Sequence, residues 1–162
     1  IGFMDSDKVA KVKEIISLEY ETQFGKLKVV EESEENDVLI IKGTLTKDER
    51  LEIEKHAEYT KVILEKIDFG KKYDNVRYIA GAHHEYLDGS GYPDRINSSK
   101  LSILVRILTI MDVYESLTSS DRPYKKPLPK HIAYKILCEM VNEGKLDKDL
   151  VGLVGKFLNL EV

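Results

Sequence analysis

The sequence of 162 residues predicts an all-α globular fold from its apolar periodicity, its helix start and stop signals and its composition. Apolar residues recur at helical spacing through most of the chain. A capping box stands at residues 46–49, and Gly or Pro separates most of the periodic segments. The hydrophobic fraction is 42% and the charged fraction 33%, which is typical of a globular domain long enough to bury a sizeable core.

Residues 1–41 predict one helix followed by a small hairpin. Either Asp5 or Ser6 could cap the helix, whose apolar positions are Val9, Val12, Ile15, Ile16 and Tyr20. Two β-branched runs, 27–30 and 38–41, flank the acidic segment 31–37. We expect the acidic segment to form a solvated turn, and the two runs to pair as a hairpin near residues 27–41.

A second helix begins at the capping box, where the Thr46 hydroxyl and the Glu49 carboxylate each satisfy a backbone N–H. Its expected buried stripe comprises Ile53, His56, Thr60, Ile63 or Leu64, and Ile67. Gly70 stands where this helix would end.

Four further helices are expected to follow. The third begins after Asp74 and is expected to carry Val76, Ile79, Ala80, His83 and His84. After a loop over 88–99, the fourth spans about 101–117, with Leu101, Leu104, Val105, Leu108, Met111 and Asp112 on one face. Pro127 and Pro129 introduce a helix that stops near Gly144, and Asp147 caps a last short helix.

Charge and composition exclude several classes of protein. Twenty-five basic and 29 acidic residues leave a net charge of −4, which argues against general affinity for nucleic acid or an anionic membrane. No apolar run approaches the ~18 residues of a membrane helix. The single cysteine, Cys138, excludes an internal disulfide and suits a reducing cytosol, so we expect a cytoplasmic protein.

Four polar residues indicate a metal site. His56 and Asp112 stand at otherwise apolar positions of their helices, and a buried carboxylate is costly unless it is paired or bound to a metal. Taken singly, His56 is more simply a structural histidine, and Asp112 is as well explained by a buried cap or ion pair. With the adjacent His83 and His84, however, they offer three imidazoles and a carboxylate, a set suited to Zn, Fe, Mn or Ni.

A glycine-rich loop follows the histidine pair. Gly89 and Gly91 permit a tight or left-handed backbone, and Pro93 fixes the exit of the loop. Beside a metal, such a loop could present backbone N–H groups and the Tyr92 ring to a ligand. As turn chemistry alone it is unremarkable.

Residues 83–93, His-His-Glu-x-x-Asp-Gly-x-Gly-Tyr-Pro, resemble the signature of the HD-GYP domains. The resemblance extends over roughly residues 40–140 and includes 42–49, 106–119 and 122–125. It implies a helical bundle of the HD superfamily. It also implies a bacterial phosphodiesterase that opens cyclic di-GMP with two or three metal ions, usually iron or manganese.

The resemblance also assigns roles residue by residue. It implies that His56, His83, His84 and Asp112 are metal ligands, and that Arg122, Lys125 and Tyr92 contact the substrate. Glu85, Asp88, Gly89, Gly91 and Pro93 complete the signature loop. An alignment of Gly25-Lys26 with the Ile-Gly-Lys of the family makes Lys26 the catalytic lysine.

The sequence departs from the family at its His-Asp pair, because Thr22 and Gln23 stand in that place and the dipeptide occurs nowhere in the chain. The resemblance implies that the aspartate of this pair bridges two metal ions. Because the chain lacks it, we expect one metal ion or none, and impaired catalysis. We therefore expect either a weak metal-dependent cyclic di-GMP phosphodiesterase or a module that senses a nucleotide or binds a protein in a signalling pathway. Whether the chain forms a homodimer is left open by the sequence.

We expect one HD-GYP-like domain over 1–162. In it, residues 1–41 form a divergent or incomplete N-terminal part, 42–143 the recognisable core and 144–162 the C-terminal helix.

Overall fold

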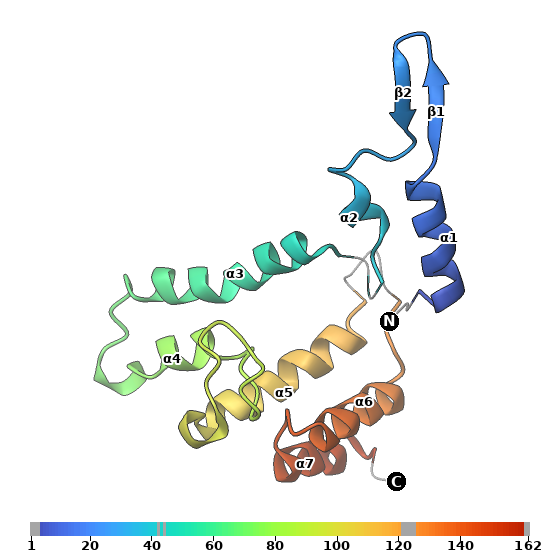
Figure 1. Ribbon diagram of the computed structural model, residues 1–162. Helices are drawn as coiled ribbons and strands as arrows, with labels where there is room; N and C mark the ends of the chain where they lie inside the picture. The colour runs from blue at the N-terminus through green and yellow to red at the C-terminus, as the bar shows by residue number, and fades with distance from the viewer. Residues whose placement is uncertain (1–3, 42, 44, 121–125, 161–162) are drawn as a thin grey trace. The chain divides into compact units, whose positions relative to one another are not determined.

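The computed structural model describes residues 4–41, 43, 45–120 and 126–160, and it confirms the helical fold class (Figure 1). The described residues form seven α-helices, two 3-10 turns and one two-stranded hairpin. The chain divides into two compact units, Ile1–Ile53 and Glu54–Val162, which we call the first and second units. None of the described helices is long and apolar enough to cross a membrane.

In the first unit, helix α1 spans Ser6–Ile16 and is capped by Asp5, whose carboxylate accepts a hydrogen bond from the Lys8 N–H at 2.9 Å. The strands β1 (Glu19–Thr22) and β2 (Gly25–Lys28) pair antiparallel, with Thr22 opposite Gly25. The Thr22 hydroxyl donates to the Gly25 carbonyl at 2.8 Å and closes the turn. Gly25 has a φ of 120°, a conformation that L side chains rarely adopt.

The expected position of the hairpin is wrong. Run 27–30 pairs in part with residues before it rather than with run 38–41, and Val38 instead ends the short helix α2, Glu35–Val38. The two-residue connection between β1 and β2 closes at a lower entropic cost than the acidic seven-residue segment would. Tyr20, expected on the first helix, consequently lies in β1.

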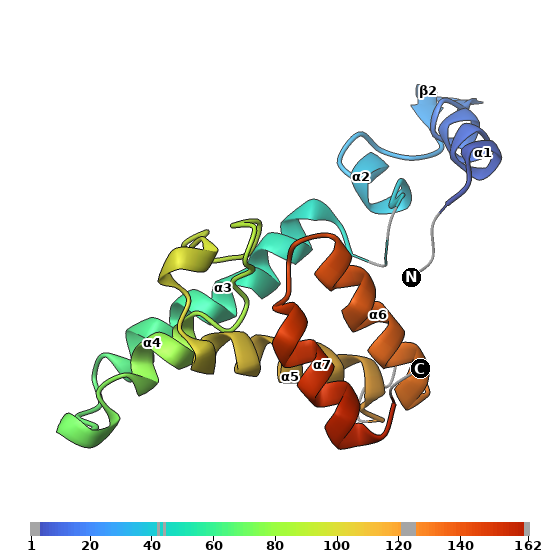
Figure 2. The ribbon, with the colours of Figure 1, turned by 90° about the horizontal axis from the view of Figure 1, so that it is seen from below.

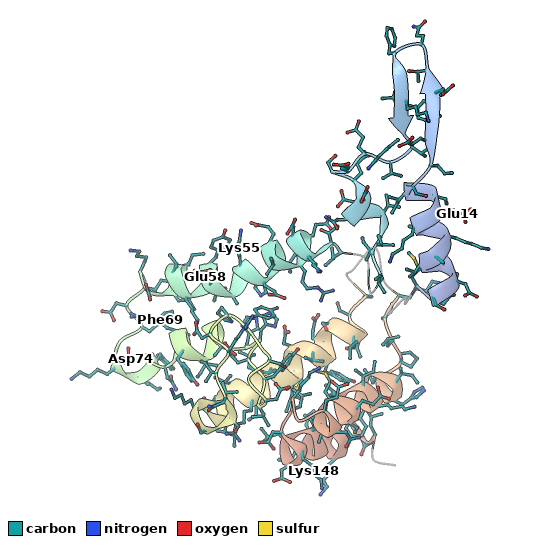
Figure 3. The ribbon with its side chains drawn as sticks, in the orientation of Figure 1. Glu14, Lys55, Glu58, Phe69, Asp74 and Lys148 are labelled. Atoms are coloured by element: carbon teal, nitrogen blue, oxygen red, sulfur yellow. The ribbon has the colours of Figure 1, made fainter. Side chains whose placement is uncertain are left out.

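Helix α3 spans Lys47–Leu64, and the predicted capping box is confirmed at its start. The Thr46 N–H donates to the Glu49 carboxylate at 2.8 Å, and the Glu49 N–H donates to the Thr46 hydroxyl at 3.2 Å. The predicted buried stripe is wrong. Among the described residues of α3 only Ala57 is buried, whereas Ile53, His56 and Ile63 are exposed, as are Lys55 and Glu58 (Figure 3).

Helix α4 spans Val76–Gly81, after a 3-10 turn over Lys71–Tyr73. It ends before the histidine pair, so the expectation that His83 and His84 lie on this helix is wrong. The Ala82 N–H makes the last helical hydrogen bond, to the Tyr78 carbonyl at 3.1 Å, and the chain then turns. A second 3-10 turn, Ser98–Lys100, ends the loop that follows.

The core of the second unit forms where α5 (Ile103–Thr118) contacts α6 (Lys130–Asn142) and α7 (Lys148–Leu158), as Figures 1 and 2 show. Its buried residues are Ile110, Tyr114, Ala133, Leu137, Leu146 and Val151. A smaller buried cluster comprises Ala82, Leu101 and Val105. The predicted α6 and its stop near Gly144 are confirmed, as is the cap of α7 by Asp147, which accepts from the Asp149 N–H at 3.1 Å.

The buried face of α5 differs from the one that the sequence predicts. Val105 is buried as expected, but the other buried positions of α5 are Thr109, Ile110 and Tyr114. Leu104, Leu108 and Met111 are instead exposed, and Asp112 is only partly buried. The helices α4, α6 and α7 all contact α5, so three neighbours select its buried face, and apolar spacing alone could not identify it.

Candidate metal centre

Three histidines of the second unit converge on one point. His56 lies in the middle of α3, and His83 and His84 lie in the turn that follows α4. One ring nitrogen from each of the three lies within 4.8 Å of the others. The ring centroids are 5.7 Å apart for His56 and His83, and 4.0 Å apart for His83 and His84.

Hydrogen bonds set the orientation of the rings. Nδ1 of His83 lies 2.6 Å from the Ala80 carbonyl oxygen. Because a carbonyl oxygen can only accept, Nδ1 donates this bond, and in the neutral ring the lone pair is then on Nε2. Metal-binding histidines commonly donate their other ring nitrogen to a carbonyl in this way. On α3, the Thr60 hydroxyl donates to the His56 carbonyl at 2.8 Å. This bond is made by the backbone of His56 and does not involve its imidazole.

His56 and His84 face each other through Nε2, at a separation of 2.8 Å and with their ring planes at 86°. Two nitrogens bound to one ion at about 2.0–2.1 Å would lie roughly 3 Å apart when adjacent in the coordination sphere. The observed separation is close to that value. Small rotations of the side chains would therefore suffice to place both nitrogens on one ion.

Asp112 lies on the other side of the His84 ring. Its Oδ2 atom is 3.7 Å from Nδ1 of His84, and among the described residues the compact donor cluster contains the three histidines without Asp112. A carboxylate in this position supplies negative charge next to the cluster. It can also orient the imidazole, as carboxylates behind metal-bound histidines do.

The environment keeps His84 neutral. Burial, together with the smaller effect of charge repulsion from the neighbouring His83 and His56 rings, lowers the pKa of His84 to about 4. At neutral pH the His84 ring is thus unprotonated. Because a metal binds only to the neutral imidazole, this residue is ready to act as a ligand without losing a proton.

Tyr92 closes one side of the cluster. Its ring stacks on the His84 ring, with centroids 4.6 Å apart and planes at 26°. Burial raises the pKa of Tyr92 to about 12, helped by the acidic neighbours Tyr86, Glu54 and Asp112. The hydroxyl therefore stays protonated at neutral pH and can donate a hydrogen bond to an anionic ligand.

Gly91 allows the signature loop to fold back over the histidine pair. A Cβ atom at Gly91 would lie 2.5 Å from the Glu85 Cα, from the His84 carbonyl oxygen and from the Tyr86 nitrogen, all of which are backbone atoms. The Tyr92 N–H donates to the same His84 carbonyl at 3.2 Å. Only glycine permits this approach, which places Tyr92 against His84.

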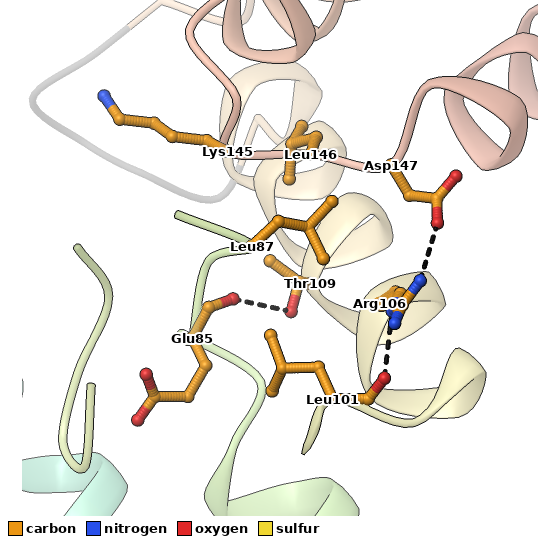
Figure 4. A pocket seen from close by; sticks show the side chains of 8 residues that line it. All are labelled: Glu85, Leu87, Leu101, Arg106, Thr109, Lys145, Leu146 and Asp147. Carbon is orange, nitrogen blue, oxygen red and sulfur yellow. Dashed lines mark hydrogen bonds and ion pairs between the residues drawn. The ribbon is translucent and has the colours of Figure 1, made fainter. Parts of the chain in front are cut away.

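Glu85 holds the far half of the loop. It is 1% exposed, and its two carboxylate oxygens accept hydrogen bonds from the Asp94 N–H at 2.7 Å and the Ile96 N–H at 2.8 Å. Its carbonyl oxygen faces the Thr109 hydroxyl of α5, while the carboxylate points away from α5 (Figure 4). Sequence reasoning placed Glu85 in the loop but missed this function, although a carboxylate directly before a glycine-rich loop is a natural acceptor for loop N–H groups.

The other loop residues shape the turn. The Asp88 carboxylate accepts from the Ser90 N–H at 2.9 Å and from the Ser90 hydroxyl at 2.7 Å, and Gly89 has a φ of 76°. Pro93 follows Tyr92 and is partly buried. Farther along, Arg106 of α5 bonds the Leu101 carbonyl and pairs with Asp147 at 3.1 Å, which fixes the end of the loop to the start of α7 (Figure 4).

The resemblance implies roles for three further residues. Arg122 and Lys125 fall outside the described residues. Lys26 is exposed on β2 of the first unit, and Thr22 and Gln23 belong to the hairpin turn of the same unit.

Comparison with known proteins identifies the family. The profile described as HD domain matches residues 36–150, which is most of the chain. The chain belongs to the HD domain family. This HD domain is 35% identical over 125 residues, 77% of the chain, to the 3'3'-cGAMP-specific phosphodiesterase 3 of Vibrio cholerae.

Two further relatives carry related names. Over 94 residues, 56% of the chain, the HD domain is 35% identical to the cyclic di-GMP phosphodiesterase response regulator RpfG of Xanthomonas campestris. Over 83 residues, 51% of the chain, it is 37% identical to a cyclic di-GMP phosphodiesterase of Thermotoga maritima. The matches cover 26%, 24% and 21% of the three relatives, so the chain spans about a quarter of their length. Together with the signature at 83–93, these relatives show that the HD domain is of the HD-GYP type.

Proposed function

We propose that this HD domain binds one divalent transition ion and a cyclic dinucleotide, and that it acts in bacterial cyclic-dinucleotide signalling with little or no hydrolysis of its ligand. The observation that carries the proposal is the cluster of three imidazoles within 4.8 Å, one of them stacked on Tyr92. Iron and manganese are the ions that we expect, since imidazole and carboxylate donors suit both.

In this proposal His56, His83 and His84 hold the ion through one ring nitrogen each, and Asp112 contributes the negative charge. The ion, when bound, would act as a Lewis acid toward a phosphoryl oxygen. The hydrogen bond from His83 to the Ala80 carbonyl and the neutral state of His84 support this assignment, because both leave a lone pair available.

A cyclic dinucleotide presents two phosphodiester groups, and the chain offers donors for them. The Tyr92 hydroxyl can donate to a phosphoryl oxygen beside the cluster. Arg122 and Lys125 are proposed as further phosphate contacts, Arg122 by a bidentate bond and Lys125 as a point charge. The named activities of the relatives, on cyclic di-GMP and on 3'3'-cGAMP, support this class of ligand.

Impaired catalysis follows from the donors that the sequence supplies. Two ions held by a bridging carboxylate activate water and stabilise both oxygens of an in-line displacement. The chain has Thr22 and Gln23 where the family has the bridging His-Asp pair, and four donors complete only one coordination sphere. The resemblance alone is the basis on which Lys26 is proposed as a catalytic lysine for any residual activity.

The presence of Thr22 and Gln23 in place of the His-Asp pair also favours a second candidate function. In it, the domain is a non-catalytic module that senses a nucleotide or binds a protein partner. A homodimer is one such association. Binding of ligand without turnover would support this candidate as well as the main proposal, whereas binding only to a protein would support this candidate alone.

The test uses the purified chain with Mn²⁺ or Fe²⁺ and either cyclic di-GMP or 3'3'-cGAMP. Calorimetry measures binding, and chromatography follows linear and mononucleotide products. We expect binding in the presence of metal and turnover far below ~1 per second, the lower end of typical enzyme rates. Turnover at that rate or faster, lost in His84→Ala, would contradict impaired catalysis. Failure to bind either dinucleotide would contradict the proposed ligand.

A further inference from the structure

We infer that Lys61 is a positioning residue that holds α3, and with it His56, against the segment that carries His83 and His84. This inference rests on the proposed metal site and adds a residue that the family signature does not contain. Lys61 lies five residues after His56, about 7.5 Å farther along α3. It therefore acts at a second point of the same helix, away from the imidazole cluster.

The side chain of Lys61 lies across α4 at Gly81. A Cβ atom built on Gly81 would lie 2.5 Å from Cγ of Lys61 and 2.9 Å from its Cε, so the missing side chain makes room for the lysine stem. Gly81 itself is buried. On α3, Ala57 stands four residues before Lys61 on the same face and is fully buried. The contact of α3 with α4 at this point therefore runs through the apolar stem of Lys61, for which Gly81 leaves room.

Beyond Gly81 the Lys61 ammonium pairs with the carboxylate of Asp94, the residue after Pro93 in the signature loop. The side chain of Lys61 is 27% exposed and that of Asp94 is 54% exposed, so water screens the pair only in part. The pair joins α3 to the loop whose Tyr92 stacks on His84.

Asp94 is itself fixed to the interior. Its N–H donates to the buried carboxylate of Glu85 at 2.7 Å, and Glu85 immediately follows His84. The chain of contacts from Lys61 through Asp94 to Glu85 thus ends one residue from the histidine pair. Because the anchor is held by a buried group, Lys61 binds to a preorganised partner, and its loss should release α3 rather than displace the loop.

Without Lys61, α3 would lose one of the contacts that hold His56 beside the rings of His83, His84 and Tyr92. A shift of about 1 Å is enough to weaken a metal site whose ligands must meet at fixed distances. The contact of the Lys61 stem with Gly81 distinguishes Lys61 from a lysine that only adds positive charge. Lys66, which is exposed, is a nearby lysine of the second kind.

The test has a readout that does not depend on metal. Ring ¹H–¹⁵N spectra of the metal-free chain report the environments of its four histidines, of which His131 on α6 is exposed and serves as the internal reference. Lys61→Met keeps the apolar stem and removes the ammonium. Asp94→Ala removes the other partner of the ion pair, at an exposed position of the loop. Lys66→Met is the matched control. We expect the signals of His56 and His84 to move in the first two variants, those of His131 to stay, and the control to match the wild type.

The second readout is Co²⁺ binding by visible absorption. We expect Lys61→Met and Asp94→Ala to weaken Co²⁺ affinity about tenfold and to change the absorption envelope, as loss of an outer-shell contact does. A lower Tm with wild-type histidine spectra in both variants would show that Lys61 only stabilises the fold, and would overturn the inference. If the wild type bound no Co²⁺, the proposed function would fail, while the histidine spectra would still decide the role of Lys61.

Discussion

The Nε2 atoms of His56 and His84 lie 2.8 Å apart, although 28 residues separate them in the chain. One belongs to the exposed middle of α3 and the other to a turn after α4. The rings of His56 and His84 meet edge to face, and the centroid of the His83 ring lies 4.0 Å from that of His84. A metal ion would stabilise this arrangement.

Removal of one imidazole should abolish tight metal binding. His56→Ala should weaken Mn²⁺ or Co²⁺ affinity by at least about 100-fold, since it deletes one of three clustered nitrogens and outer-shell losses alone reach that size. Competition with a chromophoric chelator measures the affinity. His131→Ala, at an exposed position of α6, is the control, and an equal loss in that variant would refute a specific site.

Asp112→Asn should lower metal affinity by about 10–100-fold while the fold stays intact. The substitution removes the negative charge that lies 3.7 Å from Nδ1 of His84. Because the Asp112 side chain is 38% exposed, little stability should be lost. Circular dichroism checks the fold and calorimetry the affinity; unchanged affinity would exclude Asp112 from the site.

Gly91→Ala should destabilise the second unit by about 1–3 kcal/mol, because its Cβ would meet three backbone atoms that cannot move aside. Gly152→Ala, on α7 with open space around it, is the matched control and should be neutral or stabilising by up to ~1 kcal/mol. Urea unfolding measures both. Equal stabilities of the two variants would show that the loop does not pack against residues 84–86 as described.

Glu85→Gln should cost about 1–3 kcal/mol, because an amide can accept from only one of the two N–H groups that the carboxylate now satisfies and opposes the other with its own donors. Hydrogen exchange at the Asp94 and Ile96 amides should accelerate. Glu143→Gln, at an exposed surface pair with Lys145, should change stability by less than ~1 kcal/mol. Unchanged exchange in Glu85→Gln would contradict the proposed anchor.

Local signals in the sequence predicted the starts of α3 and α7 correctly. The capping box at Thr46 and Glu49 and the cap at Asp147 each involve residues three or fewer positions apart, so the sequence contains the whole interaction. The signature at 83–93 likewise predicted a tight loop beside His83 and His84. Such features depend on backbone chemistry that neighbouring residues decide.

Features that depend on tertiary contacts could not be predicted in this way. The buried face of α5 is selected by three neighbouring helices, and α4 ends before His83 although the apolar pattern continues. The contacts of Lys61 with Gly81 and Asp94 leave no mark in the sequence, because a lysine on a polar helix is expected to be solvated. The hairpin closes at Thr22–Gly25 and not around the acidic segment, because a two-residue connection costs less loop entropy than a seven-residue one.

The central claim is that the three histidines form a site for a single ion. Elemental analysis of the chain, purified without added metal or chelator and then dialysed against Mn²⁺ or Fe²⁺, tests it most directly. We expect about one transition ion per chain in the wild type and close to none in a His56→Ala, His84→Ala double variant. Two or more ions per chain, or an equal content in the wild type and the double variant, would contradict it.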